Sequence, residues 1–259
     1  MRSDDRRDRV LEVKNQYFGD VNDYMKYGLL RCFCAAGFRL GVCWMLTPDD
    51  GRSDGGKTAY LSNQERWRHH DPPLFGALTL ALRVRDGRHI RHAENGLLPG
   101  ALFFSEVVPD DSVGRSSWFE RAIDRLQGAD LIFFDADNGI EVPSKPRGRT
   151  ESSKYLYRDE IAATWSRGAS LLVFQHFRRK ARDEDTWELR RDLQRITPSS
   201  TIVALASANV LFLVASRPEH QPKTADALRR VESTWSTRIW NAAGPSNRVT
   251  GTKPRPDSI

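Results

Sequence analysis

The sequence predicts an α/β domain with a mostly parallel sheet and a C-terminal antiparallel hairpin. Short apolar runs rich in β-forming residues alternate along the chain with segments of helical periodicity, which is typical of a parallel sheet covered by helices on both faces. The last two apolar runs, 201–206 and 210–215, follow each other almost directly, so they must pair as an antiparallel hairpin. At 259 residues the chain is long enough for one such domain with a sizeable core.

The individual elements are predicted from periodicity and from turn residues. The predicted strands are 40–46, 101–108, 131–135, 169–174, 201–206 and 210–215. The predicted helices are 21–38, 74–84, 117–127, 157–166 and 183–196. In the first helix Tyr24, Tyr27 and Leu30 recur at helical spacing, and Gly37 is its expected end. The uninterrupted apolar run LGVCWML that follows is typical of a strand buried on both faces.

The two ends of the chain differ from its centre in composition. They are charged or rich in Pro, Ser, Thr and Arg, and they hold few apolar residues with which to form a core. We therefore predict a single Rossmann-like α/β domain at 14–217 and a partly helical C-terminal extension at 218–243. Disordered tails are expected at 1–13 and 244–259.

Charge and cysteine content limit the class of protein. The net charge of +6 favours polyanionic partners such as nucleic acid or a nucleotide, although an Arg-rich composition needs no ligand by itself. The three cysteines, Cys32, Cys34 and Cys43, lie among apolar residues and are expected to be reduced, buried thiols of a cytoplasmic protein. The sequence contains no apolar run of membrane-spanning length, so no membrane partner is expected.

Three polar segments directly follow predicted parallel strands. They are the segment 47–51 (TPDDG), the segment 135–139 (DADNG) and the pair Gln175-His176. Ligands of open parallel sheets bind at the carboxyl ends of the strands. The sequence therefore predicts that these segments share one edge of the sheet and form a site there.

The DADNG segment is the centre of the predicted site. Asp135 closes a buried strand, so its carboxylate needs a partner: a metal, a Lys or Arg, or a substrate amino group. Gly139 allows the positive φ that such a turn requires. We predict that Asp135, Asp137, Asn138 and His176 are catalytic. The alternatives are an Asx-rich turn without chemistry and a purely structural histidine.

The following loop is predicted to contact substrate. The segment 143–153 is long, basic and contains glycine, and loops of this length are often functional or disordered. Ser152 and Ser153 are candidate caps for the next helix. The predicted substrate-binding residues are Lys154, Tyr155, Arg178 and Arg179, because cations near strand ends suit phosphates. Each of these cations could equally be a solvated side chain at a helix start.

The segment 16–31 (QYFGDVNDYMKYGLLR) resembles the Asn-x-x-Asp-x-x-Lys-His opening of a bacterial family of large-subunit ribosomal RNA adenine-N6 methyltransferases. In that family the motif precedes the first Rossmann strand and helps to hold S-adenosylmethionine. Asp23, Lys26 and Tyr27 fall on its Asp, Lys and His positions. Asp135 matches the Asp of the family's Asp-Pro-Pro-Tyr motif. The resemblance implies a class I methyltransferase-like fold, with S-adenosylmethionine as cofactor and with Asp49, Asp50 and Gly51 lining the cofactor side.

Four further stretches, LGVCWMLTPDDG, FFDADNGIE, SSKYLY and QHFRR, resemble a widespread, uncharacterised bacterial and prophage family. The chain also departs from the methyltransferase pattern. The DADNG segment lacks both prolines and the aromatic residue that stacks on a flipped base, and the segment 47–51 lacks a close Gly-x-Gly. The sequence has no acid that stands clearly at the end of a second strand to hold a ribose.

Three functions remain open on the sequence alone. The first is a methyltransferase-like enzyme acting on nucleic acid or a nucleotide, in which Asp135 and Asn138 accept hydrogen bonds from a target amino group. The second is a Mg²⁺-dependent nuclease or phosphoesterase of phage-defence type. Its metal ligands would be Asp135, Asp137 and Glu141, together with Asp49. The third is a non-catalytic binding module.

Overall fold

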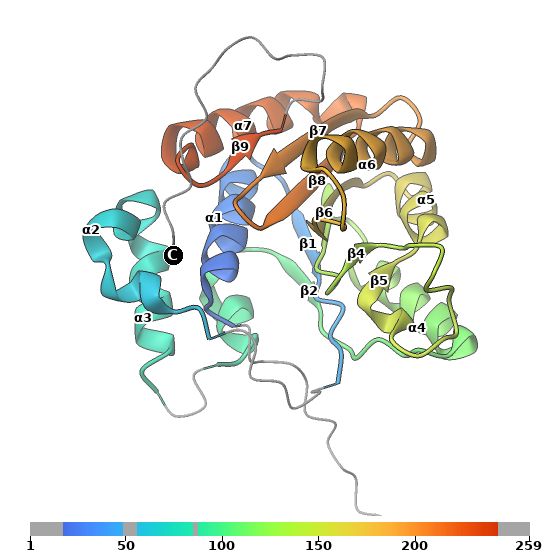
Figure 1. Ribbon diagram of the computed structural model, residues 1–259, viewed down its shortest axis with the longest axis horizontal. Coiled ribbons are helices and arrows are strands. Elements are labelled where there is room, and N and C mark those ends of the chain that lie inside the picture. The colour runs from blue at the N-terminus through green and yellow to red at the C-terminus, as the bar shows by residue number, and fades with distance from the viewer. Residues whose placement is uncertain (1–17, 49–55, 85–87, 243–259) are drawn as a thin grey trace, which may run out of the picture.

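A seven-stranded sheet with helices on both faces forms the centre of the protein (Figure 1). The computed structural model describes residues 18–48, 56–84 and 88–242. The predicted tails at 1–13 and 244–259, and the predicted cofactor residues Asp49, Asp50 and Gly51, lie outside these ranges.

The strands of the large sheet are ordered β2-β1-β3-β6-β8-β7-β9. Their bounds are β1 Leu40–Cys43, β2 Leu102–Phe104, β3 Leu131–Phe134, β6 Ser170–His176, β7 Thr201–Ala206, β8 Val210–Ser216 and β9 Trp240–Asn241. Strands β2, β1, β3 and β6 are parallel to one another, whereas β8, β7 and β9 each pair antiparallel with the preceding strand in the order. The predicted α/β architecture and its antiparallel hairpin are confirmed. A small parallel pair, β4 Gly139–Ile140 and β5 Tyr155–Leu156, lies beside the sheet.

The helices form two layers. Their bounds are α1 Val21–Ala35, α2 Gln64–Trp67, α3 Pro72–Ala81, α4 Ser112–Arg125, α5 Arg158–Ser166, α6 Arg182–Ile196 and α7 Gln221–Trp235. Short 3-10 or π turns are η1 Ala59–Ser62, η2 Arg68–His70, η3 Ala93–Leu97, η4 Ser152–Lys154 and η5 Pro218–His220. None of the helices in the described ranges is long and apolar enough to cross a membrane.

Alternation along the strands divides the core into two parts. In β3, Leu131 and Phe133 face the layer of α1, α3 and α7, whereas Ile132 and Phe134 face the layer of α4, α5 and α6. All four residues are buried, because helices cover both faces of the strand. The apolar run predicted here from the sequence therefore reflects burial on both sides.

Several elements differ from the predicted bounds; β2, for example, covers only Leu102–Phe104 of the predicted 101–108, and two of the differences have a local cause. Strand β1 ends at Cys43, earlier than predicted, because Met45 adopts a φ of +49° and turns the chain. Helix α4 begins at Ser112, five residues before the predicted start at 117, because the Asp111 carboxylate caps it by accepting a hydrogen bond from Gly114 N at 2.7 Å. Apolar periodicity does not detect a polar first turn.

Helix α7 packs across α1 and closes the layer on that face of the sheet (Figure 1). Trp235 at its end is fully buried, and its indole lies against Gly28 of α1 and stacks on His70 at a centroid distance of 5.0 Å. Strand β9 then joins the edge of the sheet at β7. The segment after residue 217 is therefore part of the same core as the parallel strands.

The contact between α1 and α7 makes Gly28 sensitive to substitution. In Gly28→Ala the added Cβ would lie 2.0 Å from Cζ2 of Trp235, a ring without room to move. We expect the free energy of unfolding to fall by about 1–3 kcal/mol in urea denaturation. The matched variant Gly76→Ala on α3 meets nothing within 4 Å, so helix propensity alone should raise it by about 0.5–1 kcal/mol. Equal effects of the two substitutions would contradict this account of the packing.

Candidate functional site

A buried lysine lies between two carboxylates at the carboxyl end of the sheet. Lys26 Nζ is 2.8 Å from Asp23 Oδ1 on its own helix and 2.8 Å from Asp135 Oδ2, which directly follows β3. The Lys26 side chain is 8% exposed, and its ammonium group lies 4.9 Å from the centre of the Phe174 ring. The partner that the sequence required for Asp135 is therefore Lys26, 109 residues earlier in the chain.

The first turn of α1 holds Asp23 in place. Asp20 caps the helix, since its Oδ1 accepts a hydrogen bond from Asp23 N at 2.8 Å. Asp23 Oδ2 in turn accepts hydrogen bonds from Tyr27 Oη at 3.0 Å and from Gly19 N at 3.1 Å. Because Asp23, Lys26 and Tyr27 are spaced three and four residues apart, the helix places them on one face. The three residues selected by the sequence resemblance thus form one hydrogen-bonded unit.

Negative charge exceeds positive charge in this cluster. Burial raises the pKa of Asp135 to about 6 against the opposing charge of Lys26. Burial and the charge of Asp23 raise the pKa of Asp20 to about 7. For Lys26, burial alone would lower the pKa, but the charges of Asp135 and Asp23 outweigh it and raise the pKa above its ordinary value. The three acids and one lysine therefore favour binding of a proton or another cationic group.

The described residues of the three predicted strand-end segments meet at one edge of the sheet. The Thr47 hydroxyl donates a hydrogen bond of 3.0 Å to Asp137 Oδ2, which joins the end of β1 to the DADNG segment. Gln175 of β6 holds the other side of that segment: its Oε1 accepts from Ile140 N at 2.8 Å and its Nε2 donates to Asn138 O at 3.2 Å. Gly139 has a φ of +85°, as predicted, and an added Cβ there would lie 2.3 Å from Gln175 Oε1.

His176 is the last residue of β6 and reaches solvent at the same edge. Its ring lies 5.2 Å from that of Phe174 in an edge-on arrangement. Burial of part of the ring and the positive charge of Lys26 lower the pKa of His176, against the opposing charge of Asp137. The neutral imidazole is therefore favoured at neutral pH, and its nitrogens can accept or donate a hydrogen bond.

The loop at 143–153 has a defined conformation that the sequence did not predict. Asp110 anchors it by accepting hydrogen bonds from Glu151 N at 3.0 Å and Ser153 N at 2.7 Å. The prediction that Ser152 and Ser153 cap the following helix is wrong, because both bind Asp110 and α5 begins only at Arg158. The Asp110 carboxylate, more than forty residues earlier in the chain, binds these serines in place of the helix N-terminus.

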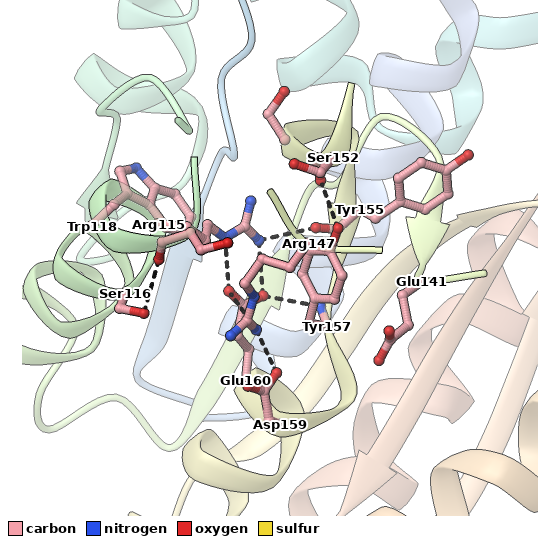
Figure 2. Close-up of polar contacts among 12 residues, drawn as sticks. Arg115, Ser116, Trp118, Glu141, Arg147, Ser152, Tyr155, Tyr157, Asp159 and Glu160 are labelled. Atoms are coloured by element: carbon pink, nitrogen blue, oxygen red, sulfur yellow. Dashed lines mark hydrogen bonds and ion pairs between the residues drawn. The ribbon is translucent and has the colours of Figure 1, made fainter. Parts of the chain in front are cut away.

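A second buried ion pair fixes the base of this loop (Figure 2). Arg115 Nε and Nη2 lie 2.7 and 2.8 Å from the two carboxylate oxygens of Glu160, and both side chains are nearly inaccessible to solvent. The guanidinium carbon of Arg147 lies 4.6 Å from the centre of the Tyr157 ring. Nη2 of Arg147 lies 2.5 Å from Oδ1 of Asp159. In Figure 2 the Tyr155 ring points away from this cluster. The two arginines and two acids of this cluster balance each other in charge, so we interpret the cluster as a structural anchor for the loop.

Most of the predicted substrate-binding cations already have partners within the protein. Lys154 Nζ lies 2.8 Å from Glu151 Oε1. Arg178 pairs with the buried carboxylate of Asp185, and its N–H donates a further hydrogen bond of 2.8 Å to that carboxylate. Tyr155 lies in β5, with its backbone oxygen bound by Arg115. Arg179 is exposed.

The alternative metal site is not assembled by the described residues. Glu141 Oε1 accepts a hydrogen bond of 2.8 Å from Arg158 N at the start of α5. Lys26 Nζ occupies the position between Asp23 and Asp135. No group of three or more His, Cys, Asp or Glu side chains in the described part of the chain could hold a metal ion.

Comparisons with protein-family models, with curated proteins and with solved structures gave no match.

The sequence did not reveal the roles of Asp20 and Gln175 in holding the candidate site. Asp20 had a detectable signal, because an Asp three residues before another acid at a helix start is a capping pattern. Gln175 was noted at a strand end, but its role in holding the DADNG segment depends on contacts across the sheet. No local pattern in the sequence encodes those contacts.

Removing the buried lysine should be much more costly than removing a partly exposed one. Lys26→Met leaves Asp23 and Asp135 buried without a cation, so we expect a loss of about 3–5 kcal/mol in the free energy of unfolding. The control Lys154→Met breaks an ion pair with the partly exposed Glu151 and should cost less than about 1 kcal/mol. Urea denaturation measures both, and similar losses would show that the Lys26 cluster is not strongly coupled.

The raised pKa of Asp20 predicts a pH dependence of stability. The folded state holds a proton up to a pKa of about 7, whereas the unfolded chain releases it near 3.8. The associated stabilisation is therefore fully present below pH 3.8 and is lost as the pH rises through about 7. Relative to Asp20→Asn, which keeps the cap acceptor, the wild type should lose on the order of 3 kcal/mol across this window. If the free energy of unfolding changes with pH in the same way for the wild type and for Asp20→Asn, this prediction is refuted.

Proposed function

We propose that the protein is an S-adenosylmethionine-dependent, methyltransferase-like enzyme that acts on nucleic acid or a nucleotide at the carboxyl ends of its parallel strands. The observation that carries this proposal is the 2.8 Å contact between Lys26 and Asp135. The resemblance to adenine-N6 methyltransferases rested on two short stretches far apart in the sequence. Their charged residues meet in the folded protein, which supports reading them as parts of one site.

The fold supports the same proposal. Four parallel strands followed by an antiparallel hairpin are the layout expected of the class I methyltransferase fold. The chain runs from β1 to β2 on one side of β1 and then returns to β3 on the other side. Ligands of open α/β sheets bind at such a switch point, and Asp135 stands there.

The side chains present also fit the cofactor. S-adenosylmethionine supplies an electrophilic methyl group on a positively charged sulfonium. The excess of carboxylates around Lys26 favours a cationic group at this position, because Asp23 and Asp135 outnumber the single lysine. Asp23, Lys26 and Tyr27 would form the wall of the cofactor site, as the resemblance implies.

Asp135 and Asn138 can orient a target amino group. Lys26 binds Oδ2 of Asp135, and none of the described residues donates a hydrogen bond to Oδ1, so Oδ1 can accept one from the amine. With a pKa of about 6, Asp135 is ionised at neutral pH and is a strong acceptor. The backbone of Asn138 is fixed by Gln175 and Lys154, which leaves its side-chain amide as a second acceptor. Positioning and polarisation of the amine are the main demands of methyl transfer on the protein.

The Mg²⁺-dependent nuclease or phosphoesterase is the weaker alternative. A divalent cation would need several carboxylate oxygens, but the ammonium group of Lys26 lies between two of them and Glu141 is bound to α5.

The test combines cofactor binding with transfer activity. Calorimetric titration should show that the wild type binds S-adenosylmethionine, and radiolabelled methyl groups should appear in a mixture of RNA, DNA and nucleotides. Asp135→Asn should lower transfer by a factor of roughly 100 or more, because a charged acceptor at the reacting amine is lost. Asp124→Asn, an exposed acid paired with Arg167, should leave transfer unchanged.

Absence of S-adenosylmethionine binding by the wild type would sink the proposal. Cleavage of plasmid or RNA that requires Mg²⁺, is blocked by EDTA and is lost in Asp135→Asn would favour the hydrolase instead.

A further inference from the structure

His176 presents an imidazole at a fixed place on the carboxyl edge of the sheet. Its backbone pairs with Val210 of β8, and its carbonyl oxygen accepts a hydrogen bond of 2.8 Å from Nε2 of Gln175. His176 is exposed, whereas the six residues before it in β6 are buried. The backbone of this histidine is therefore held by the sheet while its ring reaches solvent.

Phe174 connects this imidazole to the Lys26 cluster. The Phe174 ring lies 5.2 Å from the His176 ring and 4.9 Å from the Lys26 ammonium group, so both side chains lie against the same ring. Strand β6 pairs with β3, and Asp135 directly follows β3. The imidazole therefore lies on the β6 side of the position proposed for the target amine.

Methyl transfer to an amino group leaves a proton to be removed. The lone pair of the nitrogen forms the new bond to the methyl carbon, while the carbon–sulfur bond breaks and its electron pair stays on sulfur. The methylated nitrogen then carries a positive charge and one proton more than the neutral product. A side chain that takes this proton must be deprotonated at neutral pH and must be able to pass the proton to water.

Other groups at this edge are less suited to take the proton. Asp135 is ionised at neutral pH, but its side chain is only 16% exposed and its charge balances that of Lys26. A proton on Asp135 would leave the buried ammonium group of Lys26 with one counter-charge fewer. The Tyr27 hydroxyl donates to Asp23, and burial raises the pKa of Tyr27. The neutral imidazole of His176 meets both requirements.

The charges around His176 keep it neutral between turnovers. Burial of part of the ring has the largest effect and lowers the pKa of His176. Lys26 of α1 and Lys57, in the segment before η1, lower it further through their positive charges. Asp137 of the DADNG segment opposes them, so its negative charge stabilises the ring during the time that it holds a proton.

We propose that His176 accepts the proton that the target amine releases and passes it to solvent. The inference rests on the proposed function and adds a second catalytic residue to it. Asp135 holds the amine, and an imidazole nitrogen of His176 removes its proton. The two side chains come from neighbouring parallel strands.

The charge state of His176 is measured on the protein without cofactor. The NMR signals of the imidazole C–H groups, assigned by their loss in His176→Gln, should titrate with a pKa below the ordinary value of 6.5. Lys57→Met removes a positive charge and should raise this pKa. A wild-type pKa above neutral pH would mean a ring that is already protonated, which overturns the proposal.

Proton removal is tested by single-turnover methyl transfer from S-adenosylmethionine to a mixture of RNA, DNA and nucleotides. His176→Gln should lower the rate by a factor of roughly 100, while the Kd for S-adenosylmethionine, measured by calorimetry, stays unchanged. The matched control is His69→Gln, because His69 is also exposed but lies on η2, and its rate should equal that of the wild type. In His176→Ala, added imidazole should restore part of the rate in proportion to its neutral form.

Each outcome supports or overturns the role of His176. A wild-type rate in His176→Gln, an equal loss in His69→Gln, or no response of His176→Ala to imidazole overturns it and leaves the proposed function standing. Failure of the wild type to bind S-adenosylmethionine or to transfer its methyl group overturns the proposed function and this inference together. The imidazole response separates proton removal from a purely structural role, which a small base in solution would not restore.

Discussion

The placement of Lys26 between Asp23 and Asp135 is the constraint on which the rest of the site depends. Charges are costly to remove from water, and a buried ion pair offsets that cost only when its geometry is good and its remaining oxygens are bound. Here Asp23 receives two further hydrogen bonds, from Tyr27 and Gly19. The cluster therefore links α1 to the end of β3 through a buried charge contact.

Packing and backbone geometry hold α1 and the DADNG segment in place around the Lys26 cluster. Helix α1 packs against α7 in the layer that covers one face of the sheet, and the absence of a side chain at Gly28 lets the Trp235 ring approach. On the other side of the cluster, Gln175 and Thr47 fix the DADNG segment from two neighbouring strands. A site at the edge of a sheet is thus held by both flanking strands and by a helix that precedes them.

The sequence predicted the strands and turns more fully than the side-chain contacts between distant residues. Burial on both faces makes β3 a continuous apolar run, and positive φ at Gly139 is a local demand, so both were visible in the residues themselves. The sequence also required a partner for Asp135, but it left the choice open between a metal, a cation and a substrate. That choice depends on a contact over 109 residues, which no local pattern encodes.

The wrong prediction of helix caps and the internal pairing of Arg178 have the same cause. Ser152 and Ser153 have the composition of helix caps, and Arg178 that of a phosphate contact. Each is instead bound by an acid from another element, Asp110 for the serines and Asp185 for Arg178. Side chains that look available in sequence are engaged when a distant carboxylate is better placed than solvent.

The order of the strands also determines the order of the polar side chains along the edge of the sheet. Beginning at β2 and β1, the edge carries the Glu94 carboxylate, which accepts a hydrogen bond from the Trp44 indole. At β3 it carries the acid-rich Lys26 cluster, which favours positive charge, and at β6 it ends in Gln175 and His176. The proposed role of Asp135 therefore depends on its place between the carboxylate near β1 and β2 and the amide and imidazole groups at β6.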